Sequence, residues 1–369
     1  MAETATYTDM KEEVRLMKGN EAIAHAAIRY GCDGYFGYPI TPQSEVLETL
    51  EALMPWETTG MTVLQAESEV AAINMVYGGA ASGKAVMTSS SSPGISLKQE
   101  GISYMAGAEL PALILNVMRG GPGLGTIQPS QADYFQATKG GGHGDYHLIV
   151  LAPSSVQEMV DFVALGFDLS FKYRTPAMIL ADGIVGQMME KVVLPGQRPR
   201  RTEEQVREQC PWAANGRKGM RRRNVITSLE LESSRMEEIN NRLQARYAEI
   251  CANEPRWEEL GVEDADYLIV AFGSVARICA KAAQLSRDKG VKVGILRPIT
   301  LWPFPEEAVR KAAQGKKGIL CVELNAGQMI EDVRLAVHDA LPVKHYGRLG
   351  GIIPSPQEVA DVLEREFVK

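Results

Sequence analysis

The 369-residue sequence lacks most of the features that mark metal-binding, nucleic-acid-binding and membrane proteins. Its five cysteines include no C-x-x-C pair, so neither an iron–sulfur cluster nor a structural zinc site is indicated. The formal net charge of −7 argues against nucleic acid as a partner. No apolar run approaches the roughly 20 residues that cross a bilayer, and residues 1–15 lack the layout of a signal peptide. We therefore expect a cytoplasmic protein with reduced thiols and without membrane or nucleic-acid partners.

What the sequence does contain is an alternation of short apolar runs with longer amphipathic segments. The runs predict buried strands at 33–36, 61–64, 85–88, 112–117, 148–151 and 177–180. Segments such as 155–172 have helical periodicity, and this alternation predicts an α/β fold, a mostly parallel sheet with helices on both faces. A second α/β unit begins near residue 266. We expect four parts: an N-terminal extension (1–17), a first α/β domain (18–195), a basic linker and helical connector (196–265) and a second α/β domain (266–369).

Four polar loops follow predicted strands of the first unit. They are Tyr38–Thr41, Glu67–Glu69, Ser89–Gly94 and Arg119–Thr126. In parallel α/β sheets, ligands bind beyond the carboxyl ends of the strands, and those ends lie at one edge. We therefore expect the four loops to gather there and to form a binding site.

Two helix starts in this region have the chemistry of a site. Thr41 followed by Pro42 predicts an N-cap and a first helical proline, with a helix that continues to about Pro55 and an N-terminus that favours an anion. Glu67 and Glu69 precede a hydrophobic helix. A carboxylate in that position is either a solvated first-turn charge or a working acid/base. The residues alone leave both explanations open.

Arg119 directly follows a predicted buried strand. A guanidinium in such a place needs a partner, and its planar fork suits a carboxylate. The partner is either a bound carboxylate or an internal aspartate or glutamate, and both alternatives remain.

Other motifs have simpler explanations. Gly78–Ala85 imitates a P-loop, but Ala85 replaces the final hydroxyl and a helix precedes the motif, so we interpret it as a helix C-cap. His143 and His147 have metal-like spacing but lie in a glycine-rich loop, which gives a zinc site little support. Ser89–Ser92 lacks a nucleophile elbow. The basic run 217–223 is more typical of a solvated or subunit-contacting linker than of an anion site.

Five ordered segments together resemble the α subunit of 2-oxoacid:ferredoxin oxidoreductases, and most closely the branched-chain (2-ketoisovalerate) members. They are Tyr38–Pro42, Gln65–Glu69, Thr88–Gly94, Asn116–Gly123 and Gln128–Gln131. The resemblance is strong over 18–192 and moderate from 266 onward. It implies that 18–195 is the pyrimidine-binding half of a thiamine diphosphate site, a doubly wound parallel sheet. It also implies that 266–369 is a transketolase C-terminal-like domain.

The resemblance also implies roles for single residues. Glu69 would hydrogen-bond the aminopyrimidine ring and stabilise its imino tautomer, whose nitrogen removes the thiazolium proton. Thr41 and Arg119 would lie beside the carboxylate and keto oxygens of the substrate. The other implied cofactor-binding residues are Tyr38, Pro39, Ile40, Ser91 and Ser92.

The implied reaction converts a branched-chain 2-oxoacid and coenzyme A into acyl-CoA and CO₂, and electrons pass through [4Fe–4S] clusters to ferredoxin. This chain lacks the G-D-G motif that is common at the Mg²⁺–diphosphate site; Ala181–Gly183 is the nearest sequence and has no suitable asparagine after it. It also lacks cysteine pairs for clusters. The resemblance thus implies partners: a β subunit with the Mg²⁺–diphosphate site, and γ and ferredoxin-like δ subunits.

Three alternatives remain at this point. They are a subunit specific for 2-oxoglutarate or another 2-oxoacid, a β-like subunit of a lipoamide-linked oxoacid dehydrogenase, and a non-catalytic assembly subunit. Between Tyr38 and Gln131 the basic residues are Lys84, Lys98 and Arg119. We expect Lys84 at a helix end and Lys98 on a helix surface, which leaves no cation for a second carboxylate. The pattern therefore favours an uncharged branched-chain substrate.

Overall fold

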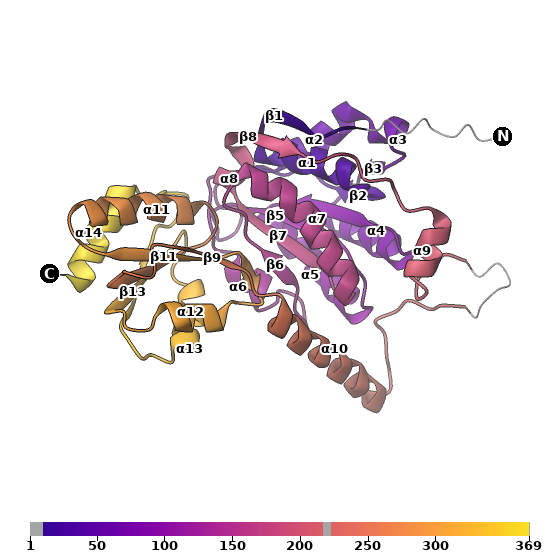
Figure 1. Ribbon diagram of the computed structural model, residues 1–369. Coiled ribbons are helices and arrows are strands. Elements are labelled where there is room, and N and C mark those ends of the chain that lie inside the picture. Colours follow the sequence, from indigo (N-terminus) through magenta and orange to yellow (C-terminus); the bar gives the residue numbers. More distant parts are fainter. Residues whose placement is uncertain (1–9, 217–222, 369) are drawn as a thin grey trace.

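The computed structural model describes residues 10–216 and 223–368, so most of the N-terminal extension and most of the basic run lie outside the described residues. Figure 1 shows a larger α/β unit, a smaller α/β unit beside it, and a long helix below them. The fold is the expected α/β arrangement of mainly parallel sheets. No helix among the described residues is long and apolar enough to span a bilayer.

The larger unit is built on a seven-stranded sheet with the order β12-β6-β7-β5-β4-β2-β3. Neighbouring strands from β6 to β3 are parallel, and β12 joins β6 antiparallel. The strands are β2 (Gly34–Gly37), β3 (Thr62–Gln65), β4 (Val86–Ser90), β5 (Leu113–Met118), β6 (Ile149–Leu151), β7 (Ala177–Asp182) and β12 (Thr300–Trp302). All six predicted runs therefore form strands, with ends shifted by one or two residues. Every residue of β4, β5, β6 and β7 is buried, as continuous apolar runs require.

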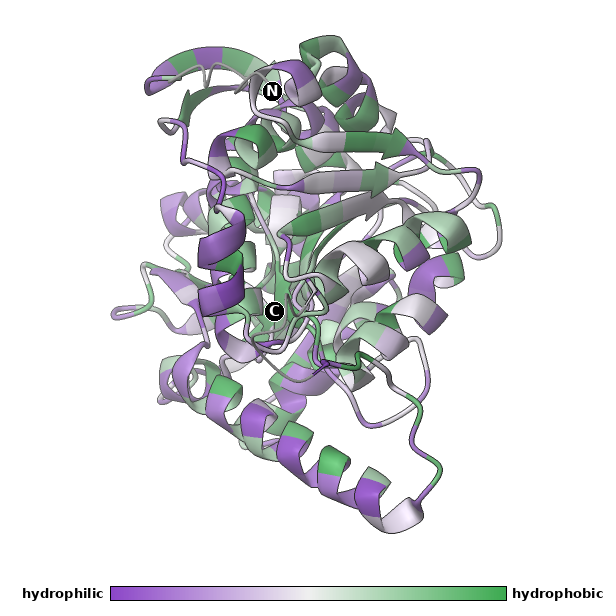
Figure 2. Ribbon diagram, turned by 90° about the vertical axis from the view of Figure 1, so that its right-hand side faces the viewer, coloured by the Kyte–Doolittle hydropathy of each residue, from purple (hydrophilic) through white to green (hydrophobic). Residues whose placement is uncertain are grey.

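Helices pack on this sheet in pairs. Helix α1 lies against α7, and α4 lies against α5. The helices of this unit are α1 (Gly19–Tyr30), α2 (Ser44–Leu53), α3 (Pro55–Thr58), α4 (Glu69–Ala81), α5 (Ser92–Gly107), α6 (Tyr134–Thr138), α7 (Val156–Tyr173) and α8 (Gly183–Gln187). In Figure 2 the strands are largely green, while purple is concentrated on peripheral helices, as burial of the apolar sheet demands. The motif Gly78–Ala85 ends α4, and Gly83 has a φ of 83°, which confirms its interpretation as a helix end.

The sequence prediction of the α2 start was wrong. The helix begins at Ser44 with Gln43 as N-cap, whereas Thr41 and Pro42 lie in the preceding turn and are joined by a cis peptide bond. The Pro42 carbonyl accepts hydrogen bonds from Asn20 Nδ2 at 2.6 Å and from Gln187 Nε2 at 2.9 Å. These side chains, distant in sequence, hold the turn outside the helix.

The smaller unit has a five-stranded sheet with the order β14-β13-β10-β11-β9. Its strands are β9 (Trp257–Leu260), β10 (Tyr267–Val270), β11 (Val293–Pro298), β13 (Gly318–Glu323) and β14 (Val343–Gly347). Its helices are α11 (Gly273–Asp288), α12 (Glu306–Ala312), α13 (Met329–Val337) and α14 (Pro356–Phe367). Strand β9, antiparallel to β11, begins before residue 266, where we expected this domain to start.

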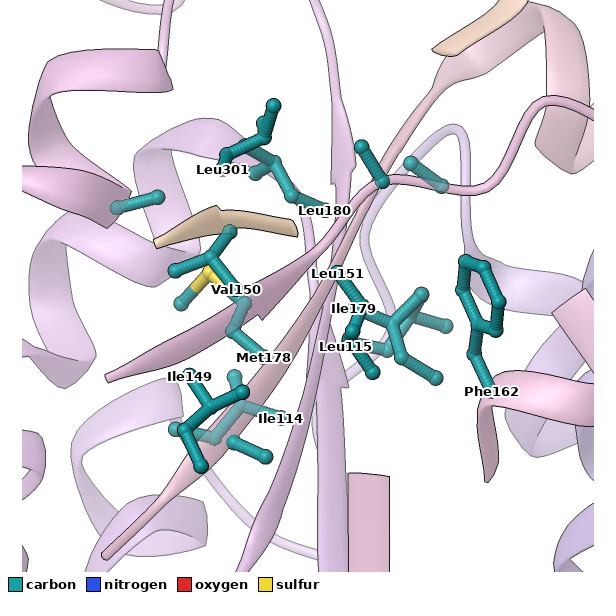
Figure 3. Close-up of a cluster of buried hydrophobic side chains, with 14 of the residues drawn as sticks. Ile114, Leu115, Ile149, Val150, Leu151, Phe162, Met178, Ile179, Leu180 and Leu301 are labelled. Carbon is teal, nitrogen blue, oxygen red and sulfur yellow. The ribbon is translucent and has the colours of Figure 1, made fainter. Parts of the chain in front are cut away.

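The remaining elements frame the two units. Strands β1 (Glu13–Lys18) and β8 (Met189–Leu194) form a separate antiparallel ribbon that the sequence did not reveal. In the connector, α9 (Glu203–Gln209) is followed by α10 (Ser233–Asn253), so this part of the chain is helical as expected. Strand β12 comes from the second half of the chain but completes the first sheet, and Figure 3 shows Leu301 of β12 beside Val150 and Leu180.

Candidate active site

Glu69 is the first residue of α4 and lies where the chain leaves β3 at the carboxyl edge of the sheet. Ser68 is the N-cap, and its hydroxyl accepts a hydrogen bond from Ala71 N at 3.2 Å. The Glu69 side chain is only 7% exposed. Among the described residues, nothing donates a hydrogen bond to its carboxylate and no cation lies within ion-pair distance. A buried carboxylate without partners is costly, so this geometry disfavours the explanation as a solvated first-turn charge.

The start of α5 faces this carboxylate. A Cβ atom at Gly94 would lie 2.8 Å from Glu69 Oε1 and 2.1 Å from Ser90 Oγ, so the close approach requires glycine. The hydroxyls of Ser90 and Ser91 are buried and have no hydrogen-bond partner among the described residues. Buried polar groups are normally paired. A concentration of unpaired ones around Glu69 indicates a place for a polar ligand.

Arg119 follows β5 at the same edge and is 8% exposed. Its Nη1 donates to Thr41 O at 2.9 Å, and its Nη2 donates to Leu124 O at 3.0 Å. Its Nε is buried and has no partner among the described residues. No carboxylate of a described residue lies within 4 Å of the guanidinium, so the alternative of an internal ion pair is wrong for this part of the chain. Thr41 contributes its backbone carbonyl to this contact, and its side chain is exposed.

The Ser92 side chain connects the start of α5 with the loop that follows β5. Its Oγ accepts from Arg119 N at 3.0 Å and donates to Asp133 Oδ2 at 2.6 Å. Asn116 Nδ2 also donates to Asp133 Oδ2, at 2.9 Å. Burial raises the pKa of the Asp133 carboxyl, and these two hydrogen bonds work in the opposite direction. Together, these hydrogen bonds fix the start of α5 relative to the start of the loop after β5.

The loop before α2 is held equally firmly. Gln43 is fully buried, and its Nε2 donates to Tyr38 O at 3.2 Å. Ser89 Oγ bonds Gln43 Oε1 and lies 2.6 Å from the Tyr35 hydroxyl. Tyr38 and Ile40 are half-buried and Pro39 is exposed, so this loop forms the rim of the site.

A cavity of about 440 Å³ adjoins Arg119. Ser92, Pro93 and Asp133 line it from the larger unit, and Leu324, Asn325 and Leu349 line it from the smaller one. Arg119 is the single cationic side chain among its described lining residues, and Asp133 is the single anionic one. The cavity therefore offers one anchor for a carboxylate and no second cation.

The expectation for Lys98 was wrong. The residue is on α5, but its side chain is completely buried, because Nζ donates to Thr88 Oγ1 at 3.2 Å and to the Glu69 carbonyl at 3.4 Å. Lys84 lies beside Asp33, 3.8 Å away, just after the end of α4, as expected.

Asp182 of the nearest G-D-G-like sequence has a structural role. Its carboxylate accepts from Ile184 N at 3.0 Å, Val185 N at 3.2 Å and Ser274 N at 3.0 Å, and thus caps α8 and ties β7 to α11. His147 stacks on Trp302 at a centroid distance of 4.5 Å. No group of three or more His, Cys, Asp or Glu side chains in the described residues is arranged to hold a metal ion.

Sequence reasoning missed four residues that build this edge: Gln43, Gly94, Asn116 and Asp133. Two signals were available. The Ser-Pro-Gly sequence at 92–94 is typical of a helix start with proline near N1. An asparagine inside the apolar run 113–118 must bond to something. Nothing local identifies Asp133, whose partners lie on two other elements.

Comparisons with known proteins agree with this architecture. Residues 25–249 match the family model described as pyruvate flavodoxin/ferredoxin oxidoreductase, thiamine diphosphate-binding, and residues 265–359 match pyruvate:ferredoxin oxidoreductase core domain II. A solved 2-oxoglutarate:ferredoxin oxidoreductase from Magnetococcus marinus superimposes with a TM-score of 0.82 at 27% identity, over 96% of this chain. This chain spans 65% of that one. These matches show that the chain has the thiamine-diphosphate-binding, transketolase-like fold.

Relatives in sequence narrow the class. A ketoisovalerate oxidoreductase subunit of Methanothermobacter marburgensis is 49% identical over 95% of this chain and 96% of its own length. A 2-oxoglutarate synthase subunit of Archaeoglobus fulgidus is 38% identical over 96% of this chain and 100% of its own length. The chain belongs to the 2-oxoacid:ferredoxin oxidoreductase family and is a subunit of an oxidoreductase.

Proposed function

We propose that this chain is the α subunit of a branched-chain 2-oxoacid:ferredoxin oxidoreductase and contributes the pyrimidine side of a shared thiamine diphosphate site. The observation that carries the proposal is the buried Glu69 carboxylate, which has no partner among the described residues and lies beside the unpaired hydroxyls of Ser90 and Ser91. These groups fit a polar heterocycle that offers both donors and acceptors.

In this proposal, thiamine diphosphate supplies the electron sink for decarboxylation when it is bound. Glu69 exchanges a proton with the pyrimidine ring, as a buried acid/base in a fixed position can do. Ser91, Ser92, Tyr38, Pro39 and Ile40 shape the surrounding wall. Residues Ser90 and Gly94 belong to the same wall, because Gly94 allows α5 to approach the carboxylate.

Arg119 binds the carboxylate that all 2-oxoacids share. Within the described part of the chain, its guanidinium donates to the carbonyls of Thr41 and Leu124 and retains an unpaired Nε–H. A substrate carboxylate would supply the missing acceptor, and charge-assisted hydrogen bonds to arginine are among the strong ones. The Thr41 backbone orients the guanidinium, and the exposed Thr41 side chain is available to the keto oxygen.

The choice among 2-oxoacids rests on the adjoining cavity. A distal carboxylate, as in 2-oxoglutarate, would find no second cation among the described lining residues and would approach Asp133. Lys98 is fully buried and bonded on α5, so it cannot reach such a group. We therefore infer a preference for 2-oxoisovalerate and its homologues, in keeping with the relatives at 49% identity.

The remaining parts of the reaction belong to partners in this proposal. A β subunit supplies the Mg²⁺–diphosphate site, and γ and ferredoxin-like δ subunits supply contacts and the [4Fe–4S] clusters that pass electrons to ferredoxin. Coenzyme A is the co-substrate that accepts the acyl group. The assembled enzyme works in the cytoplasm.

The decisive experiment uses the purified native complex. We expect its absorption spectrum to show iron–sulfur clusters, and its ferredoxin reduction to require thiamine diphosphate and coenzyme A, with higher kcat/KM for 2-oxoisovalerate than for 2-oxoglutarate. A preference for 2-oxoglutarate overturns the substrate assignment but leaves the cofactor chemistry intact. A complex that turns over normally after Glu69→Gln shows instead that this chain is an assembly subunit. Reduction of lipoamide in place of ferredoxin also contradicts the proposal.

A further inference from the structure

Lys98 is a buried cation that has no assigned role in the proposed reaction. It lies in the middle of α5 with a side chain that is 0% exposed. Two acceptors surround its Nζ, the Thr88 hydroxyl on β4 at 3.2 Å and the Glu69 carbonyl on α4 at 3.4 Å. No described carboxylate lies within ion-pair distance of it. Two neutral acceptors do not satisfy the three donors of an ammonium group.

Lysine is an energetically unfavourable residue for such a buried position. A buried charge without an ionic partner is strongly destabilising, and a methionine would fill the same space without that destabilisation. Burial lowers the pKa of the Lys98 ammonium to about 8, while the negative charge of Glu69 works in the opposite direction. Glu69 is the titratable group that faces Lys98 from α4, and β4 presents the neutral Thr88. On α5 itself, the nearby Glu100 is exposed.

The Lys98 ammonium and the Glu69 carboxylate are therefore linked through Glu69 itself, the first residue of α4. Lys98 holds the backbone of Glu69, and the Glu69 carboxylate emerges from that residue toward Gly94 and the unpaired hydroxyl of Ser90. A hydrogen bond from a charged donor is stronger than one between neutral groups, so the Lys98 ammonium fixes the backbone from which the carboxylate emerges.

We propose that Lys98 is a positioning residue for Glu69: by binding the Glu69 carbonyl it fixes the first residue of α4, and so it directs the Glu69 carboxylate toward the pyrimidine ring. This inference rests on the proposed role of Glu69 in cofactor binding.

The sign of the pH dependence follows from the charge of Lys98. Below a pH of about 8 the ammonium is charged and its hydrogen bond to the Glu69 carbonyl is charge-assisted. As the pH rises through that value, the cation is lost and the Glu69 backbone is held less firmly. The Lys98→Met variant lacks the cation at every pH. We therefore expect variant and native enzyme to differ most at neutral and weakly acidic pH and to converge in alkaline solution.

The test uses the assembled complex with Lys98→Met, and with Lys84→Met as the matched control because Lys84 is a partly exposed lysine outside the site. In Lys98→Met we expect kcat at neutral pH to fall by about tenfold, because small misplacements of a catalytic group are costly, while KM for the 2-oxoacid stays close to the native value. We also expect the upper break near pH 8 to disappear. The control should keep the native profile.

A second readout does not depend on turnover. Calorimetric titration of the cofactor-depleted complex with thiamine diphosphate and Mg²⁺ measures the affinity for the cofactor. We expect weaker binding at neutral pH in Lys98→Met, because the Glu69 backbone is no longer held by the ammonium. An unchanged affinity and an unchanged pH profile of kcat overturn the proposal and leave Lys98 a packing residue.

If Lys98→Met does not assemble, Thr88→Val decides the matter. This variant removes one acceptor of the ammonium, so the upper break should move to lower pH; a break that stays in place overturns the proposal. Glu69→Gln separates the two levels of inference. If Glu69→Gln is inactive while Lys98→Met behaves as the native enzyme, only the role of Lys98 fails. If Glu69→Gln is active, the proposed function fails.

Discussion

Two buried glutamates, each beside the start of a helix, have opposite surroundings. Glu323 ends β13 in the smaller unit, and its carboxylate accepts hydrogen bonds from Met329 N at 2.8 Å, Ile330 N at 3.2 Å and Asn325 Nδ2 at 3.0 Å. Glu69 is buried almost as deeply and has no donor among the described residues. The first carboxylate holds a loop and a helix together. The second is kept available for something outside the chain.

The same contrast separates the joint between the units from the edge of the first sheet. At the joint, Gln131 Nε2 donates to Phe272 O at 2.9 Å, and Gln131 Oε1 accepts from Leu324 N at 3.1 Å. At the edge, Ser90 Oγ, Ser91 Oγ and Arg119 Nε lack partners among the described residues. The paired groups of Gln131 hold the two units together, whereas the unpaired groups at the edge lie where we propose that cofactor and substrate bind. Substitutions in the two regions should therefore affect different measurements.

The largest effect is expected at Glu69. Glu69→Gln keeps the volume but removes the acid/base, so we expect turnover of the assembled complex to fall by roughly 10²- to 10⁴-fold. Subunit composition on gel filtration should not change. The matched control is Glu67→Gln, because Glu67 is exposed and bonds only the Ser68 hydroxyl. Similar losses in both variants would contradict the distinction between a site carboxylate and a helix-start charge.

Arg119→Ala comes next. Removal of one partner of a desolvated charge pair costs roughly 2–5 kcal/mol, so we expect kcat/KM to fall by about thirty-fold or more for every 2-oxoacid tested. Steady-state kinetics with two 2-oxoacids that differ in their side chains measure this loss of kcat/KM. Arg277→Ala, which removes an exposed ion pair with Glu190, should leave the kinetics unchanged. A loss confined to one substrate would assign Arg119 to side-chain recognition instead.

A joint residue should change stability and leave the chemistry alone. Gln131→Ala leaves Phe272 O and Leu324 N unpaired, at about 1–3 kcal/mol for each group. We expect faster hydrogen–deuterium exchange in β13 and in the loop after it, and a lower unfolding temperature of the complex. We expect kcat/KM to stay within about three-fold of the native value, which corresponds to roughly 0.7 kcal/mol. Gln284→Ala, on an exposed face of α11, is the control. Normal exchange in Gln131→Ala would contradict the structural role.

The smallest effect concerns selectivity. Asp133→Asn removes the negative charge in the cavity, so a distal carboxylate should be disfavoured less. We expect the ratio of kcat/KM for 2-oxoglutarate over 2-oxoisovalerate to rise by about tenfold, the equivalent of 1.4 kcal/mol. Asp145→Asn, at an exposed loop position, should leave that ratio as it is. A ratio that does not move would place the substrate side chain away from Asp133.

Most of the sheet could be predicted from the sequence, because the central strands are buried on both faces and their apolar runs are unmistakable. Ribbon β1–β8 could not, since the pairing of Val14 with Val193 joins residues far apart in the chain. Glu69 and Arg119 were expected at the carboxyl edge of the sheet from their positions after predicted strands, and both lie there. Lys98 was misplaced because periodicity in α5 is weak and its partner Thr88 belongs to another element.

The donated strand β12 has a consequence for synthesis. Strand β6 ends at Leu151, and the strand that covers its edge begins at Thr300, about 150 residues later. At about 5–20 residues per second, a growing chain would expose that edge on the ribosome for roughly 7 to 30 seconds. An open, apolar strand edge is a template for pairing with other chains. The order in which this polypeptide leaves the ribosome therefore makes it a natural client for chaperones, until residue 302 has emerged and the sheet can close.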